Sequence, residues 1–123
     1  MPKTKSDVVR LRHMLDAAQK ALTFIQGRNR QDLDTNEQLA LALVRLIEIM
    51  GEAASKVSKE VKERHQLVPW PDIIATRNKL IHAYDQVDLN MLWEIVSIDL
   101  LPLKENLQTI ISIEEINEQQ KLF

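Results

Sequence analysis

Residues 35–64 read TNEQLALALVRLIEIMGEAASKVSKEVKER and contain the strongest periodic pattern in the chain. Apolar residues recur there at steps of three and four, which places them on one face of an α-helix. Asp34 and Thr35 are both candidate N-caps, because Glu37 and Gln38 follow them at the spacing of a capping box. The pattern therefore predicts one long helix from Asp34 or Thr35 to about Arg64. Its apolar stripe consists of Leu39, Ala42, Leu43, Leu46, Ile49, Met50, Ala53 and Val57.

The segments on either side repeat this helical period. The first helix is expected over Ser6–Gln26, with Ser6 as its N-cap and Gly27 as its stop signal. Pro69 and Pro71 interrupt the chain after the long helix, and proline is tolerated in the first turn of a new one. A third helix is therefore expected over Asp72–Tyr84.

A fourth helix is expected to begin at the N-cap Asp88 and to continue to about Ile110. Pro102 lies within it and should kink or break it. Residues 112–123 are expected to form either a short fifth helix or a frayed tail. Two glycines and four prolines in 123 residues leave little turn material for a sheet. We predict an all-α fold: one domain over residues 1–123, built as an antiparallel four-helix bundle over about residues 6–111.

Composition narrows the functional classes. The chain has no cysteine, which excludes disulfides and thiol chemistry. Its formal net charge of −2 argues against a protein that coats nucleic acid, so RNA contact would need a local basic site. Charged residues interrupt the longest apolar run, and no secretion signal is recognisable, so we expect a cytoplasmic protein that does not span a membrane. The basic stripe Lys56, Lys59, Lys62 and Arg64 is interpreted as a solvated helix face.

We expect no metal and no cofactor. The three histidines, His13, His65 and His82, each lack the carboxylate three residues earlier that a di-iron helix bundle requires. Two isolated glycines cannot form a phosphate-binding loop. His13 and His65 are interpreted as exposed helix residues, and Trp70 and Trp93 as core or dimer-contact aromatics.

One short segment, Arg77–Tyr84, is dense in chemically useful side chains. On the predicted helix Asn78 and His82 share a face, whereas Arg77 and His82 are about 140° apart. The latter two converge only if the arginine side chain wraps around or the helix loosens near its end. An arginine can clamp a phosphate, a histidine can move protons, and RNA supplies its own 2′-hydroxyl nucleophile. From spacing alone, a structural role for Arg77 and His82 stays open.

The same segment resembles the Arg-x4-His-x-Tyr motif of HepT, a HEPN-domain ribonuclease toxin. The resemblance covers about Glu37 to Leu107 and extends to Gly51-Glu52-Ala53-Ala54, Pro69-Trp70, Val87-Asp88, Trp93 and Asp99-Leu100. It implies a helical homodimer in which the motif helices of two subunits line a shared cleft.

The resemblance also implies site roles. Arg77 would stabilise the scissile phosphate, and His82 would act as general base or acid. Asn78 and Lys79 would position the substrate. Cleavage would be independent of metal and would leave a 2′,3′-cyclic phosphate. The implied partner is an MntA-like minimal nucleotidyltransferase antitoxin, which would transfer AMP to Tyr84.

Two alternatives are kept. The chain could be a non-catalytic helical module that binds a nucleotidyltransferase and presents Tyr84 for modification, or a purely structural bundle. Glu52 is a candidate tether for Arg77, and the sequence leaves this open.

Overall fold

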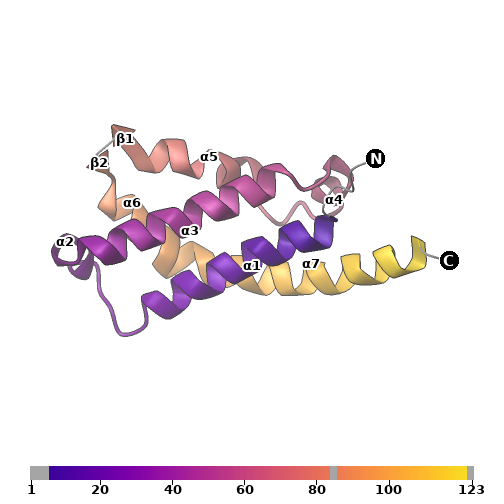
Figure 1. Ribbon diagram of the computed structural model, residues 1–123, viewed down its shortest axis with the longest axis horizontal. Helices are drawn as coiled ribbons and strands as arrows, with labels where there is room; N and C mark the ends of the chain where they lie inside the picture. The colour runs from indigo at the N-terminus through magenta and orange to yellow at the C-terminus, as the bar shows by residue number, and fades with distance from the viewer. Residues whose placement is uncertain (1–5, 84–85, 122–123) are drawn as a thin grey trace.

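The computed structural model describes residues 6–83 and 86–121. Figure 1 shows that this part of the chain is helical apart from one short hairpin. The elements are α1 (Asp7–Phe24), α2 (Asp32–Thr35), α3 (Glu37–Ser55), α4 (Lys59–Arg64), α5 (Trp70–Leu80), β1 (Ile81–Ala83), β2 (Gln86–Val87), α6 (Leu89–Glu94), the π-helical turn η1 (Ile95–Asp99) and α7 (Leu100–Lys121). The predicted all-α class is confirmed.

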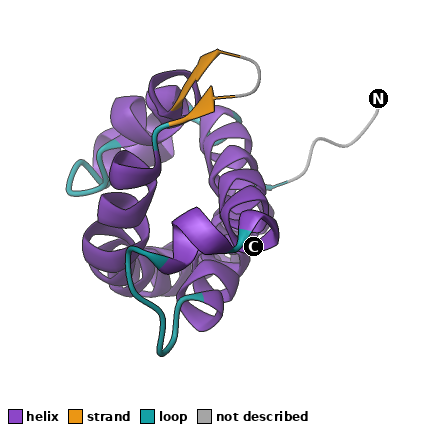
Figure 2. Ribbon diagram, turned by 90° about the vertical axis from the view of Figure 1, so that its left-hand side faces the viewer, coloured by secondary structure: helices purple, strands orange, loops and turns teal. Residues whose placement is uncertain are grey.

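The long helices alternate in direction along the chain (Figure 1). Helix α1 packs against both α3 and α7, and α3 also packs against α5. Viewed from the end that carries α2 and the hairpin, the helices surround a common centre (Figure 2). The hairpin lies at this end, whereas α4, the start of α1 and the end of α7 lie at the other (Figure 1).

Apolar stripes and polar caps explain why these helices form where they do. Most of the stripe predicted on α3 is buried, with Ala42 and Ile49 half-buried. Leu11, Met14, Leu92 and Leu107 from α1, α6 and α7 are fully buried in the same core. Four helices begin at side-chain caps, in which an oxygen accepts a backbone N–H of the first turn. The capping side chains and the N–H groups that they accept are Ser6 with Val9, Asn36 with Leu39, Ser58 with Val61 and Asp88 with Met91. Ser6 and Asp88 act as caps, as predicted.

The long second helix was predicted with the wrong ends. Helix α3 begins after Asn36, one or two residues later than expected, because the preceding residues form the separate turn of α2. It ends at Ser55, and a second helix, α4, starts after Ser58. The hydroxyl of Ser58 caps α4, and its N–H donates to the Asp7 carboxylate at 2.7 Å, which fixes the break.

The third helix begins two residues earlier than predicted, at Trp70, and also ends earlier, at Leu80 and not at Tyr84. Leu80 is fully buried, and its carbonyl accepts the N–H of Asp88 at 2.8 Å, which draws the returning chain against the helix end. Ile81 is therefore extended and pairs with Val87 in an antiparallel hairpin. β-Branched residues favour this conformation.

The fourth helix is not broken at Pro102, and the residues expected to be a tail continue it. The irregularity is the π-helical turn η1, in which the Leu100 N–H donates to the Ile95 carbonyl. A proline ring clashes with the carbonyl four residues earlier, here that of Ile98, which lies inside this wider turn. Helix α7 then continues to Lys121, so residues 112–121 form neither a separate helix nor a frayed end.

Candidate active site

Close packing of α3 on α5 sets the position of the motif residues. A Cβ atom at Gly51 on α3 would lie 3.1 Å from the backbone oxygen of Ile73 on α5. Glycine therefore favours this close approach, because a Cβ atom would require α5 to move by a few tenths of an ångström. The two helices run in opposite directions (Figure 1), so one turn back along α3 from Gly51 corresponds to one turn forward along α5 from Ile73. Those positions are occupied by Glu48 and Arg77.

Arg77 forms an ion pair with Glu48 across this seam. Its Nε lies 3.3 Å from Oε2 of Glu48, and the arginine side chain remains 56% exposed whereas that of the glutamate is 26% exposed. Arg45, one turn earlier on α3, places Nη1 3.8 Å from the same Oε2. Two guanidinium groups thus share one carboxylate oxygen at the surface of the α3–α5 seam.

The two residues after Arg77 are exposed on the last turn of α5. Asn78 is exposed, and Lys79 places its Nζ 3.7 Å from Oδ1 of Asp72, a surface pair that contributes little stability. Both side chains are accessible to a ligand that approaches this end of the helix.

His82 lies in β1, beyond the end of the helix, so it does not share a helix face with Asn78 as predicted. Ile81 is opposite Val87 and Ala83 is opposite Gln86, which leaves His82 as the extra residue of a β-bulge. The structure describes the backbone of His82 but not its side chain. Tyr84, the predicted modification site, lies outside the described residues.

The candidate tether Glu52 does not contact Arg77. Its carboxylate lies 3.6 Å from Nζ of Lys56, and the role expected of it belongs to Glu48, one turn earlier on the same helix. Within the basic stripe, Lys59 pairs with Glu63 and Arg64 with Glu114. Helix α4, which carries most of the stripe, lies at the opposite end of the molecule from the hairpin (Figure 1).

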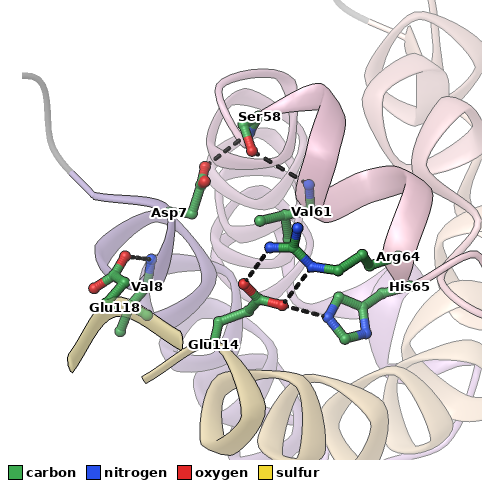
Figure 3. A network of polar contacts seen from close by, with 8 residues as sticks. All are labelled: Asp7, Val8, Ser58, Val61, Arg64, His65, Glu114 and Glu118. Carbon is green, nitrogen blue, oxygen red and sulfur yellow. Dashed lines mark hydrogen bonds and ion pairs between the residues drawn. The ribbon is translucent and has the colours of Figure 1, made fainter. Parts of the chain in front are cut away.

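A separate polar cluster centres on Glu114, which is only 3% exposed (Figure 3). Its carboxylate accepts hydrogen bonds from Nε and Nη2 of Arg64, the latter at 2.7 Å, and lies 2.6 Å from Nε2 of His65. Burial alone would raise the pKa of Glu114, but hydrogen bonds from Arg64, His65 and Asn117 and the arginine charge lower it to about 2. The same pairing raises the pKa of Arg64.

The interpretation of His13 and His65 as exposed residues was wrong. His65 ends α4 and is held against Glu114, and its side chain is 13% exposed. His13 is half-buried because α1 is covered by α3 on one flank and α7 on another. Trp70 is a core residue, as predicted, and its indole Nε1 donates to the His65 carbonyl at 3.1 Å. Trp93 is partly buried against the core.

Neither Glu48 as the partner of Arg77 nor Glu114 as a buried charge was identified from the sequence. No role was assigned to Glu48 from the sequence, although its position one turn before Gly51 indicates that it borders a close helix contact. Among the residues that the structure describes, no group of three or more histidines and carboxylates is arranged to hold a metal ion.

An open groove of about 450 Å³ adjoins the motif on the side of α5 that faces η1 and α7. Two strongly exposed apolar residues, Leu67 and Ile98, line it together with Thr76, the residue before Arg77. Within the described part of the chain, no helix combines the length and apolar character needed to cross a bilayer.

These features define a small helical protein with an exposed arginine near the end of one helix and a histidine in the bulge of the hairpin that follows. Comparison with known families identifies the family: residues 14–110 match the family model described as "Ribonuclease HepT-like". The chain belongs to the HepT-like ribonuclease family.

Several relatives are similar over most of the chain. "Putative RNase TTE0752" of Caldanaerobacter subterraneus subsp. tengcongensis is 32% identical over 85% of this chain and 94% of its own length. "Probable ribonuclease HepT" of Thermococcus cleftensis is 36% identical over 60% of this chain and 67% of its own. "Gamma-glutamylcyclotransferase and putative RNase MJ0434" of Methanocaldococcus jannaschii is 32% identical over 90% of this chain, which spans 50% of that protein. No solved structure matches.

Proposed function

We propose that this chain is a metal-independent endoribonuclease and the toxin of a toxin–antitoxin pair. The observation that carries the proposal is the exposed Arg77 at the end of α5, followed five residues later by His82 in a β-bulge. Bulges are frequent beside active sites because they redirect a side chain. Family membership and the ribonuclease names of the relatives support RNA as the substrate.

In the proposed reaction the 2′-oxygen of RNA attacks the adjacent phosphorus. A base removes the 2′-hydroxyl proton, the O2′–P bond forms, the P–O5′ bond breaks, and the 5′-oxygen leaves with a proton supplied by an acid. The products are a 2′,3′-cyclic phosphate and a 5′-hydroxyl. His82 transfers protons, Arg77 neutralises the charge on the phosphoryl oxygens, and Asn78 and Lys79 position the strand.

The first test replaces the histidine. His82→Ala should lower the rate of RNA cleavage by about 10²–10⁴, the usual contribution of general acid–base catalysis. His13→Ala, a histidine change on α1, should leave the rate within a fewfold of wild type. Cleavage should persist in EDTA and yield a cyclic phosphate end. Full activity in His82→Ala would refute the assignment.

The proposed active form is a homodimer. The exposed apolar residues Leu67 and Ile98 line a groove beside Thr76 and Arg77, so a second copy seated there would bring its own motif close. Burial of such residues favours association.

The proposed antitoxin is an MntA-like minimal nucleotidyltransferase that adds AMP to Tyr84. Nucleophilic attack of the phenol oxygen on the α-phosphorus of ATP, with the phenol proton passing to a base, would release pyrophosphate. It would leave an anionic phosphodiester seven residues after Arg77 in the sequence. Intact mass measured after coexpression should show an AMP increment that is absent in Tyr84→Phe. If the transferase is active and no increment appears, the antitoxin neutralises by binding alone.

The alternative function, a non-catalytic module that binds the transferase, predicts no RNA cleavage by the unmodified wild-type protein. Assaying a sample whose mass excludes AMP separates it from the ribonuclease.

A further inference from the structure

We propose that Arg45, Glu48 and Arg77 form a composite phosphate site across α3 and α5, in which Glu48 positions Arg77 and Arg45 binds a second backbone phosphate of RNA. This inference rests on the proposed ribonuclease function. It adds two residues of α3, Arg45 and Glu48, which lie outside the Arg-x4-His-x-Tyr motif.

The first step of the argument is the geometry at Glu48. Arg77 approaches its Oε2 through Nε at 3.3 Å, so the fork formed by the two terminal nitrogens can bind a phosphate in the bidentate manner that suits a guanidinium. A free arginine side chain samples many rotamers, and this conformational entropy is lost when it binds a substrate. An anion that already contacts Nε restricts the rotamers in advance, so less entropy is lost on binding. Glu48 is well suited to this role because its side chain is only 26% exposed and therefore less free to move.

The second step concerns Arg45. Its Nη1 lies 3.8 Å from the same Oε2, a longer contact than that of Arg77, and its side chain is 65% exposed. Exposed pairs of this kind contribute little energy, so Arg45 can exchange its partner for another anion at small cost. The three groups together carry a net charge of +1, which leaves the cluster attractive to a polyanion.

The third step is the charge of the whole chain. With a formal net charge of −2, binding to RNA depends on local cations. Lys79 supplies one such cation, because its contact with Asp72 is also an exposed pair, whereas the basic residues of α4 lie at the other end of the molecule (Figure 1). Arg45 is held beside Arg77 by a shared carboxylate, which places two cations where adjacent phosphates of one strand would pass.

Binding is tested with single-stranded RNA that is 2′-O-methylated throughout, which lacks the nucleophile and is not cleaved. Affinity is measured by fluorescence anisotropy over a series of salt concentrations. Arg45→Gln should weaken binding roughly threefold to tenfold at low salt and reduce the slope of log K against log salt by about 0.7, the share of one phosphate on a single strand. Arg12→Gln is the matched control, because Arg12 is 53% exposed and pairs with Glu115 across the α1–α7 seam. It should leave the slope unchanged.

Catalysis is tested with Glu48→Gln. Loss of the negative charge alone should strengthen RNA binding, whereas loss of positioning should lower kcat. The expected result is a kcat at least about tenfold lower with no rise in KM. Glu52→Gln makes the same charge change one turn away, where the carboxylate pairs with Lys56, and should keep the wild-type kcat.

The outcomes separate this inference from the proposed function. If wild type cleaves RNA and His82→Ala does not, but Arg45→Gln keeps the wild-type salt slope, only the composite site is refuted. An unchanged kcat in Glu48→Gln refutes the positioning role. If wild type neither binds nor cleaves RNA, both proposals fail. Thermal unfolding of each variant is measured, and if Glu48→Gln does not fold, the exposed Arg45→Gln still decides the phosphate contact.

Discussion

Among the described residues, Glu114 is the only charged side chain that is buried, and it joins elements that are distant in sequence. It lies on α7 and accepts hydrogen bonds from Arg64 at the end of α4. Its Oε2 lies 2.6 Å from Nε2 of His65 (Figure 3). A buried carboxylate is stable only when its charge is balanced and its lone pairs are satisfied. The cluster therefore fixes the position of α4 against α7, at the end of the molecule away from the motif.

Glu114→Gln should lower the free energy of unfolding at pH 7 by about 3 kcal/mol, because the buried carboxylate loses its charge-assisted hydrogen bonds with Arg64 and His65. The pKa of Glu114 is about 2 in the folded protein, against an ordinary value of 4.5 for a glutamate carboxyl. A lowered folded-state pKa stabilises the protein above the unfolded value, and that contribution, on the order of 3 kcal/mol, is lost as the pH falls from about 4.5 towards 2. Denaturant unfolding at a series of pH values should show the deficit of the variant shrinking over that window.

The neighbouring residue supplies the control. Glu115 pairs with Arg12 at the surface and is 40% exposed, so Glu115→Gln should cost less than about 1 kcal/mol at any pH. A deficit in Glu114→Gln that stayed constant down to pH 2 would assign the loss to packing and not to charge.

For contacts between single residues, the sequence predicted interactions within a helical turn better than interactions between distant segments. Ser6 and Asp88 cap helices as expected, because a cap depends on residues only three positions away. The pairing of Arg64 with Glu114 joins residues fifty positions apart, which no periodicity encodes. The partner of Arg77 was missed for the same reason: Glu48 and Glu52 differ by one helical turn, and the helix packing selects between them.

Apolar periodicity in the sequence predicted where the helices lie along the chain, but it did not predict the residues at which they end. The apolar stripe continues from α3 into α4 through the buried Val57, so the pattern alone gives no break. The break is fixed by Ser58, whose N–H is bound by Asp7 of another helix. Likewise α5 ends at Leu80 because the returning chain binds its carbonyl. This early end of α5 changes the candidate site, because it places His82 in a strand and not on the predicted helix.

The α3–α5 seam can be tested at Gly51. Gly51→Leu places a side chain against the Ile73 carbonyl, where even a Cβ atom would lie at 3.1 Å, so α5 must shift. The expected cost is about 1–3 kcal/mol of unfolding free energy, as for other overpacked sites. Because Glu48 and Arg77 meet across this seam, RNA cleavage should fall by more than the loss of folded protein explains.

Gly27→Ala is the comparison. Gly27 has φ of 71°, and a Cβ atom added there would meet nothing within 4 Å, so its cost is conformational, about 1 kcal/mol. It lies in the loop after α1 and should leave the specific activity of the folded protein unchanged. Equal losses of specific activity in both glycine variants would show that α3–α5 packing does not position the site.

At the scale of the whole molecule, the two ends of the bundle differ in character. One end holds α4 against α1 and α7 through the Asp7–Ser58 and Glu114 contacts (Figure 3). The other end carries α2 and the hairpin that bears His82 (Figure 1). We infer that the polar cluster stabilises the scaffold, and that substitutions within it reduce activity only through the folded fraction.

The proposed homodimer gives the last prediction. If a second copy covers the groove beside Thr76, Ile98→Glu should disrupt it, because a charge would be buried where a 65% exposed isoleucine now lines the groove. Light scattering should then give twice 14.2 kDa for wild type and 14.2 kDa for the variant. Phe24→Glu, at an apolar residue of α1 that is 43% exposed, should remain dimeric. A cleft shared by two motifs requires that the monomeric variant lose RNA cleavage while its unfolding free energy changes little. A monomer that cleaved at the wild-type rate would place the whole site within one chain.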